Sequence, residues 1–138
     1  MFSIRTAGDK DAQWINERYA EVQFQPSDLA KETVVIAEID GDPAGLGRLV
    51  DVDEHSCELG GMLVFERFRG RGAARAIIDA LLKHARGRMV YCIPFAHLES
   101  MYADAGFTRT DDAPRAVLEK YEWCQRTYDQ PVILMEAL

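Results

Sequence analysis

Residues 67–74 read RFRGRGAA and connect a predicted strand to a predicted helix. Gly70 and Gly72 lie two positions apart, so the backbone can turn until successive N–H groups point to one place. The helix that follows adds its unpaired N-terminal N–H groups and the positive end of its dipole. Positive side chains surround this turn in an otherwise acidic chain: Arg67, Arg69 and Arg71. The segment therefore predicts a cradle for a diphosphate.

Three other interpretations of this turn are weaker on chemical grounds. A P-loop needs Lys followed by Ser or Thr after its glycines, and residues 67–76 contain neither pair. A dinucleotide-binding GxGxxG motif needs a third glycine where Arg75 stands, and it follows the first strand of its domain rather than a later one. The third interpretation is a tight loop with solvated arginines and no ligand.

The pattern on either side of the turn predicts the rest of the fold. Apolar alternation and β-branched runs predict strands at 2–5, 33–39, 44–52, 57–65, 88–94 and 132–135, and helical spacing predicts helices at 9–22, 73–86, 95–105 and 115–122. Strand, glycine-rich turn, helix, strand and helix form a βαβα unit with a parallel pair at its centre. We therefore expect an α/β or α+β fold with a mixed sheet, in a single domain over residues 1–138.

Composition supports an ordinary globular protein. The chain has 138 residues, 48% hydrophobic and 28% charged, which argues against disorder, collagen and coiled coil. No apolar run approaches the roughly 18 residues of a membrane span, and the first residues lack an apolar signal core. We expect a cytoplasmic protein that does not bind membranes.

Net charge and cysteine content limit which partners and metals the protein is expected to bind. Sixteen basic against 23 acidic residues give a net charge of −7, which disfavours nucleic acid and favours a cationic partner. Three widely spaced cysteines, Cys57, Cys92 and Cys124, fit neither a disulfide framework nor a zinc site. We expect free thiols and no bound metal.

Two motifs resemble those of the GNAT superfamily of N-acetyltransferases. The RFRGRG of residues 67–72 is similar to its Gln/Arg-x-x-Gly-x-Gly/Ala pyrophosphate motif. It lies between the fourth predicted strand and the helix predicted at 73–86, which matches the motif's place in that family, between the fourth strand and the third helix. Residues 98–107, LESMYADAGF, resemble the second landmark, a helix that carries a tyrosine and ends in Gly-Phe. Two positions depart from the pattern: Glu66 replaces a frequent proline, and residues 93–95 lack the polar residue that many members place near the cofactor.

The resemblance implies a mostly antiparallel sheet whose central parallel pair separates around acetyl-CoA. It implies that the backbone of Met62, Leu63 and Val64 binds the pantetheine, with the Met62 N–H polarising the thioester carbonyl. Such a donor contributes roughly 2.7–4 kcal/mol to the transition state in other acyl transfers. The pyrophosphate would then lie on six successive residues: Arg69, Gly70, Arg71, Gly72, Ala73 and Ala74.

Two proton-transfer roles follow from the same resemblance. Tyr102 matches the general acid that protonates the thiolate of coenzyme A, although a tyrosine at this helical spacing can also be a core aromatic. Glu58 resembles the carboxylate that some members use as a base for the acceptor amine, although a strand glutamate can also be a solvated charge, with solvent as the base. Cys92 lies in a predicted buried strand with no histidine partner, so direct attack of the amine in a ternary complex is expected.

The expected function is thus acetyl transfer from acetyl-CoA to a primary amine of a small molecule or peptide. A non-catalytic acyl-CoA-binding sensor would keep the turn and would not need Tyr102. An unrelated nucleotide-binding α/β domain is the third class. Dimers are common in the GNAT superfamily, so a homodimer formed through the last strand is a further expectation.

Overall fold

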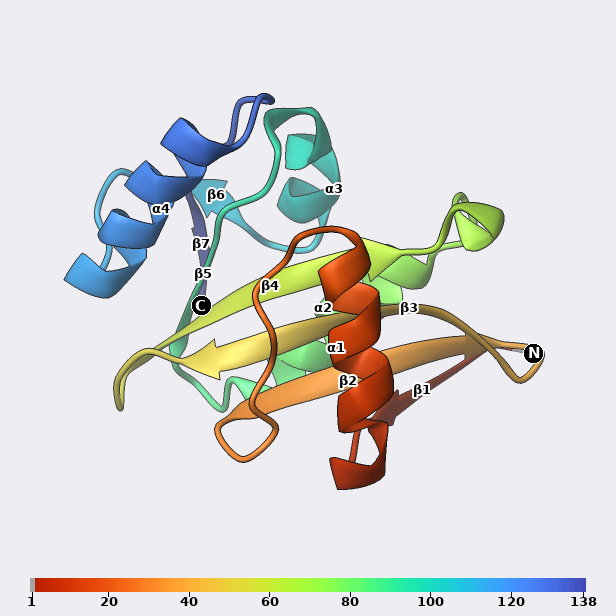
Figure 1. The fold of residues 1–138 in the computed structure, drawn as a ribbon. Helices are drawn as coiled ribbons and strands as arrows, with labels where there is room; N and C mark the ends of the chain where they lie inside the picture. The colour runs from red at the N-terminus through yellow and green to blue at the C-terminus, as the bar shows by residue number, and fades with distance from the viewer. Residues whose placement is uncertain (1) are drawn as a thin grey trace.

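The computed structural model describes residues 2–138, which form one mixed sheet with helices on both faces (Figure 1). The strands are β1 Phe2–Thr6, β2 Glu32–Ile39, β3 Asp42–Asp51, β4 Ser56–Val64, β5 Met89–Cys92, β6 Thr108–Arg109 and β7 Met135–Ala137, in the sheet order β1-β2-β3-β4-β5-β7-β6. The helices are α1 Ala12–Glu21, α2 Ala73–His84, α3 Glu99–Asp104 and α4 Arg115–Thr127, with short 3-10 turns at Asp9–Asp11, Glu66–Phe68 and Ala96–Leu98.

The parallel pair at the centre of the sheet is short. Strands β4 and β5 pair from Ser56 opposite Met89 to Leu59 opposite Cys92, where β5 ends. Strand β4 continues to Val64 and remains paired with β3 on its other side. All other neighbouring strands are antiparallel. The predicted mixed, mostly antiparallel sheet with one separating parallel pair is confirmed.

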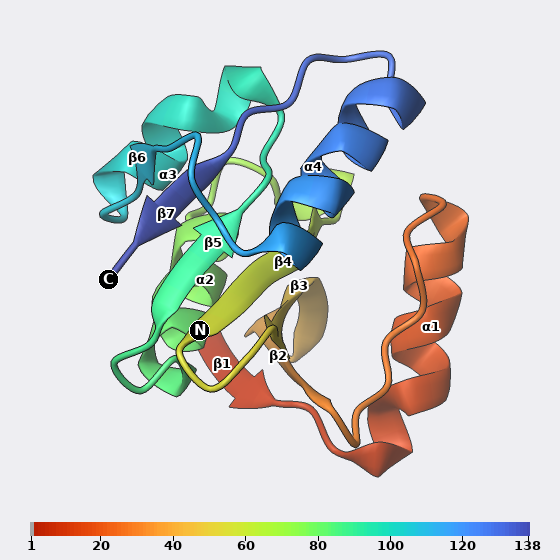
Figure 2. The same ribbon diagram turned by 90° about the vertical axis from the view of Figure 1, so that its left-hand side faces the viewer.

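Helices cover the sheet in two layers. Helices α1 and α4 lie on one face, and α2 and α3 lie on the other (Figure 2). A hydrophobic core lies on each face of the sheet, and successive side chains of β2 point alternately into one and the other. Val34 and Ile36 pack toward α1, whereas Val35 packs toward α2. Gly47 of β3 allows α2 to approach closely, since a Cβ there would lie 2.7 Å from a methyl group of Ile77.

Three elements in the last third of the chain have boundaries that differ from the prediction. The strand predicted at 132–135 is displaced to β7, and Val132 forms only an isolated bridge with Phe95. Residues 131–133 still run beside 94–96, but Pro94 and Pro131 have no N–H to donate, so a regular ladder does not form. The helix predicted at 95–105 begins as a 3-10 turn, and α4 extends past the predicted end at 122.

Among residues 2–138, no helix combines the length and the apolar character needed to cross a membrane.

Candidate active site

A bulge in β4 sets the geometry of the site. Arg48 of β3 lies opposite Gly60, whereas Leu46 lies opposite Leu63, so β4 contains one extra residue at this point. Gly61 takes up the bulge with a φ of +57°, a conformation that side chains rarely adopt. Its carbonyl accepts a 2.8 Å hydrogen bond from the Tyr19 hydroxyl of α1, which fixes the bulge from outside the strand.

The bulge reverses which backbone groups face β5. Before it, the Met89 N–H donates to the His55 carbonyl, so alternate backbone groups of the first half of β4 pair with β5. After it, the Phe65 N–H donates to Ala44 of β3 at 2.9 Å. By alternation, the N–H groups of Met62 and Val64 then point away from β3, toward the space left where β5 ends. Two backbone donors therefore face this space without a strand partner.

The turn before α2 presents further donors beside this space. Gly70 and Gly72 have φ values of +80° and +86°, and Gly72 is the N-cap of α2. The Gly72 carbonyl accepts the first helical hydrogen bond from the Ala76 N–H, so the N–H groups of the three residues between them have no partner in the helix. A Cβ at Gly70 or Gly72 would meet no heavy atom within 4 Å, so the turn has open space in front of it.

A cavity of about 750 Å³, here called the α2 cavity, lies in front of this turn. Its lining contains eight of the nine residues predicted to bind the cofactor: Met62, Leu63, Val64, Arg69, Gly70, Gly72, Ala73 and Ala74. The ninth, Arg71, is exposed outside the lining, with its guanidinium 5.8 Å from the centre of the Phe68 ring. Sequence reasoning missed Arg75, Phe95, His97, Leu98, Met101 and Gln130, which complete the wall with Tyr102.

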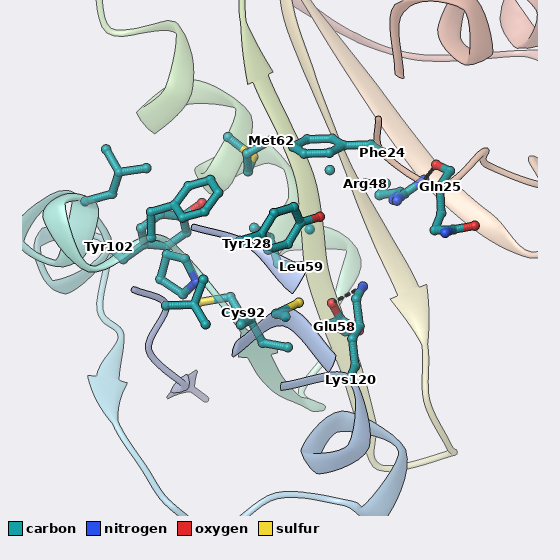
Figure 3. A pocket seen from close by; sticks show the side chains of 18 of the residues that line it. Phe24, Gln25, Arg48, Glu58, Leu59, Met62, Cys92, Tyr102, Lys120 and Tyr128 are labelled. Carbon is teal, nitrogen blue, oxygen red and sulfur yellow. Dashed lines mark hydrogen bonds and ion pairs between the residues drawn. The ribbon is translucent and has the colours of Figure 1, made fainter. Parts of the chain in front are cut away.

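A second cavity, here called the α4 cavity, lies on the α1 and α4 side of the sheet (Figure 3). It is lined from the α1–β2 loop by Phe24 and Gln25, from the strands by Arg48, Glu58 and Cys92, from α4 by Lys120, Trp123 and Cys124, and from the segment after α4 by Tyr128. For this region the sequence predicts two catalytic residues, Glu58 as a base and Tyr102 as an acid.

The two cavities share part of their walls. Met62, Phe95, Leu98 and Tyr102 line both, and they surround the gap where β4 and β5 separate. A molecule in the α2 cavity can thus meet a molecule in the α4 cavity at this gap, beside the backbone of Met62.

Tyr102 is buried at the junction of the two cavities. Its ring contacts Phe107 edge to face, with ring centres 5.8 Å apart, and the residue is only 4% exposed. Within residues 2–138 its hydroxyl has no hydrogen-bond partner, yet this oxygen is not fully enclosed. Burial raises the pKa of Tyr102, because it penalises the phenolate. The hydroxyl therefore holds its proton and can donate it into the cavities.

Glu58 lies on β4 in the α4 cavity, opposite α4. Its Oε2 accepts a 2.6 Å hydrogen bond from Lys120 Nζ, and its side chain is 10% exposed. In the described part of the chain, the other carboxylate oxygen, Oε1, has no hydrogen-bond partner and is not fully enclosed. Glu58 is therefore a buried ion-pair member with one free oxygen, and not the solvated charge that was the alternative. No local motif marks Lys120.

Arg48 is a buried cation that sequence reasoning missed. Its Nη1 donates to the Gln25 carbonyl and to Ser27 Oγ, both at 2.8 Å, and its guanidinium carbon lies 4.7 Å from the centre of the Tyr19 ring. The available signal was an arginine in the middle of the apolar strand 44–50, AGLGRLV, where a charge needs partners.

The cysteines are poor nucleophiles. Burial raises the pKa of Cys57, Cys92 and Cys124, so the thiol form dominates. Cys92 and Cys124 nevertheless line the α4 cavity, whereas the sequence had suggested only packing for Cys92. Within residues 2–138, no group of three or more His, Cys, Asp or Glu side chains is arranged to hold a metal ion.

Comparison with known proteins identifies the family. The acetyltransferase (GNAT) family model matches residues 4–109, and the chain belongs to this family. No curated protein sequence matches it. Among solved structures, Rv2747 from Mycobacterium tuberculosis, in complex with CoA and NLQ, has a TM-score of 0.78 at 18% identity, over 99% of this chain and 98% of that one.

Two other structures give the same result. Escherichia coli ElaA has a TM-score of 0.73 at 16% identity, with both chains covered completely. N-acetylglutamate synthase from Neisseria gonorrhoeae, complexed with coenzyme A and N-acetyl-glutamate, has a TM-score of 0.74 at 17% identity. The present chain is covered completely in that match but spans only 35% of the Neisseria protein. These similarities establish the GNAT fold.

Proposed function

We propose that this protein is an N-acetyltransferase that moves an acetyl group from acetyl-CoA to a primary amine of a small molecule or peptide. The observation that carries the proposal is the meeting of the α2 and α4 cavities at Met62 and Tyr102. We further propose that residues 1–138 form one acyltransferase domain that acts in the cytoplasm.

The α2 cavity fits acetyl-CoA. The free N–H groups at the start of α2 and the two glycines with positive φ suit a pyrophosphate, which needs several donors and close backbone approach. The N–H groups of Met62 and Val64 suit the pantetheine amides and the thioester carbonyl. Bound acetyl-CoA would supply the thioester, and this chain's residues would hold and orient it.

The side chains at the junction are suited to the two proton transfers. The acceptor nitrogen bonds to the acetyl carbon, the carbon–sulfur bond breaks, the sulfur takes the Tyr102 proton, and the amine proton passes to Glu58 Oε1 or to solvent. The pKa of Tyr102 lies above that of a free phenol, and desolvation raises the pKa of a thiol in the same way. Tyr102 is therefore protonated and available as a donor when the thiolate forms beside it.

Direct attack in a ternary complex is favoured over an acetylated enzyme. The cysteine facing the junction, Cys92, is 1% exposed, and burial raises its thiol pKa. The two cavities share only the residues at their junction and are otherwise lined by different parts of the chain, so both substrates can be bound at once. GNAT family membership and the coenzyme A complexes of the Mycobacterium and Neisseria neighbours support acyl transfer from an acyl-CoA.

Isothermal titration with acetyl-CoA, with ATP and NAD as controls, tests the first part. Micromolar binding of acetyl-CoA alone is expected, and its failure would refute the proposal. A panel of amines is then assayed by release of the coenzyme A thiol. Acetyl-CoA binding without thiol release for any amine would instead support the sensor hypothesis.

A further inference from the structure

We propose that the acceptor is an amino carboxylate, an amino acid or a small relative, whose carboxylate binds the free edge of Arg48. This inference rests on the proposed function and specifies its substrate class. It starts from the polar groups that line the α4 cavity.

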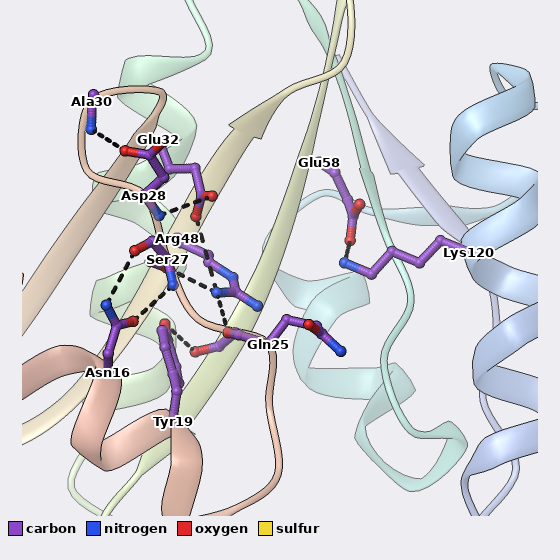
Figure 4. Close-up of polar contacts among 11 residues, drawn as sticks. Asn16, Tyr19, Gln25, Ser27, Asp28, Ala30, Glu32, Arg48, Glu58 and Lys120 are labelled. Atoms are coloured by element: carbon purple, nitrogen blue, oxygen red, sulfur yellow. Dashed lines mark hydrogen bonds and ion pairs between the residues drawn. The ribbon is translucent and has the colours of Figure 1, made fainter.

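Arg48 has unused hydrogen-bond donors in this cavity. A guanidinium carries five N–H donors, and only the Nη1 side is taken, by Gln25 and Ser27. Within residues 2–138, Nη2 has no hydrogen-bond partner and is not among the fully enclosed polar atoms, so it is open to the cavity. Figure 4 shows the Nη1 side in the loop network and the other side of Arg48 turned toward Glu58 and Lys120.

The free edge of Arg48 is already preorganised. The Arg48 side chain is only 8% exposed, and the Tyr19 ring and the loop bonds fix the guanidinium plane. A carboxylate is the group that matches two parallel N–H donors in this plane.

The charges around the cavity favour the same ligand. Its lining contains two cations, Arg48 and Lys120, and one anion, Glu58, which Lys120 already pairs. The other carboxylate near Arg48 is Glu32, on the loop side at 4.0 Å from Nη1. A polyamine or an aminoglycoside carries a second amine. In this cavity that second positive charge would face the guanidinium of Arg48, which disfavours such acceptors. The net charge of −7 favours cations at long range, but contacts inside the cavity decide which of them binds.

The placement of the two charged ends is consistent with transfer. The carboxylate would lie on Arg48, and the amine would lie between Glu58 Oε1 and the gap beside Met62. The rest of the lining is largely apolar and includes a cluster of three rings, in which Tyr128 packs edge to face against Trp123 and Phe95 with ring centres 5.9 and 5.5 Å apart. The cavity thus offers one anion site and one proton acceptor on an apolar background.

The experiment compares standard amino acids that carry a primary amine with their amides and with the amines that lack the carboxylate. Thiol release is measured for each matched set, after binding of acetyl-CoA has been measured separately. The free amino acids of the best set should have a kcat/KM roughly 10–100-fold above their amides. In Arg48→Gln this ratio should fall to about 1, mainly through KM.

Three control variants separate the guanidinium from its surroundings. Ser27→Ala removes one of the two loop bonds that fix the guanidinium, so it should lower the ratio less than Arg48→Gln does. Arg115→Gln removes an exposed charge outside the cavity lining and should keep the ratio. Lys120→Met should also keep it. A ratio lost in Lys120→Met and kept in Arg48→Gln would overturn the assignment to Arg48.

The wild-type ratio tests the proposal even where Arg48→Gln fails to fold. A protein that binds acetyl-CoA but uses the amides or the carboxylate-free amines equally well, or acetylates no amino carboxylate, overturns the substrate class. Failure to bind acetyl-CoA would instead refute the proposed function itself.

Discussion

The α2 cavity and the α4 cavity are built in different ways, although they meet at one gap. Most of the α2 cavity comes from a continuous stretch, residues 62–75, and its donors are largely backbone N–H groups. The α4 cavity is assembled from side chains spread between Phe24 and Val132. The α2 cavity is thus formed by residues that are close in sequence, whereas the residues of the α4 cavity come together only through tertiary folding.

This difference indicates how each region can change. Backbone donors constrain the conformation and leave most side chains free, so one arrangement can bind the same cofactor in many sequences. Side chains from separate elements can be exchanged one at a time, which suits a surface that selects among acceptors. The predictions below test whether the two regions are separable, starting from their junction.

The largest effect is expected for Tyr102→Phe, because this residue lines both cavities. Turnover should fall roughly 10²–10⁴-fold with unchanged acetyl-CoA affinity, since only the proton donor is lost. Because burial raises the pKa of Tyr102, the wild-type rate should not decline on the alkaline side below about pH 10. Tyr91→Phe, a buried tyrosine outside both linings, is the control. Wild-type turnover in Tyr102→Phe would show that Tyr102 is a core aromatic residue and not the general acid.

Gly72→Val should disable the α2 cavity alone. A valine at φ +86° is strained and places methyl groups in the open space before the turn, so acetyl-CoA affinity should fall by roughly 10²-fold or more. Gly87→Val carries the same strain at φ +82°, also in open space, outside the linings of both cavities. Titration calorimetry on both variants separates strain from blocked binding, and equal losses would contradict the cradle.

Glu58→Gln tests the α4 cavity. The amide cannot accept the amine proton, so kcat/KM should drop by up to roughly 10²-fold, while acetyl-CoA binding is kept. Glu119→Gln removes an exposed carboxylate of α4 that pairs with Arg115, and it should leave the rate unchanged. If a rate profile against pH is identical in Glu58→Gln and wild type, solvent is the base.

Tyr19→Phe should weaken the junction indirectly. It removes the hydrogen bond that holds the Gly61 carbonyl, so stability should decrease by about 1–3 kcal/mol and kcat by roughly tenfold as the Met62 N–H shifts. Tyr121→Phe is a matched control, because its hydroxyl makes only a long 3.5 Å contact with the Val132 carbonyl. A loss of stability with unchanged kcat would make Tyr19 purely structural.

The smallest effect on function is expected for Asp11→Asn, which lies outside both cavities. Hydrogen bonds from Arg5 and from the Gly8 N–H lower the pKa of Asp11 from 3.8 to about 2. Because the pKa of Asp11 is lower in the folded state than in the unfolded state, the ionised carboxylate stabilises the fold fully above about pH 4. This stabilisation is lost as the pH falls through 2. Because Arg5 is partly exposed, the contribution is about 1–2 kcal/mol. Urea unfolding at pH 7 and pH 2 should show a clearly larger difference from wild type at pH 7 than at pH 2.

The residues predicted to bind the cofactor lie together in the structure because the sequence signals that mark them are local. The glycines at 70 and 72, the arginines around them and the helix after them are neighbours in the chain, and the structure places all but Arg71 of the predicted residues in the wall. The side-chain partners in the α4 cavity could not be predicted in this way. Arg48 and Glu58 are near each other in sequence, but the loop contacts of one and the pairing of the other with Lys120, 62 residues away, depend on tertiary packing.

The strand predicted at 132–135 also shows that local sequence does not determine long-range contacts, here those of the backbone. Its apolar residues are buried as expected, yet Pro94 and Pro131 decide where regular pairing begins. Apolar periodicity reports burial, whereas ladder formation also needs a free N–H at each step.

The early end of β5 has a consequence for amide hydrogen exchange. The N–H groups of Met62 and Val64 lie on the unpaired edge of β4, so they should exchange with solvent deuterons far faster than those of Leu59, which lies within the parallel pair. A ligand that pairs with this edge would act as an additional strand and slow both amides selectively. Two amide signals thus give a residue-level measure of whether the central gap in the sheet is filled.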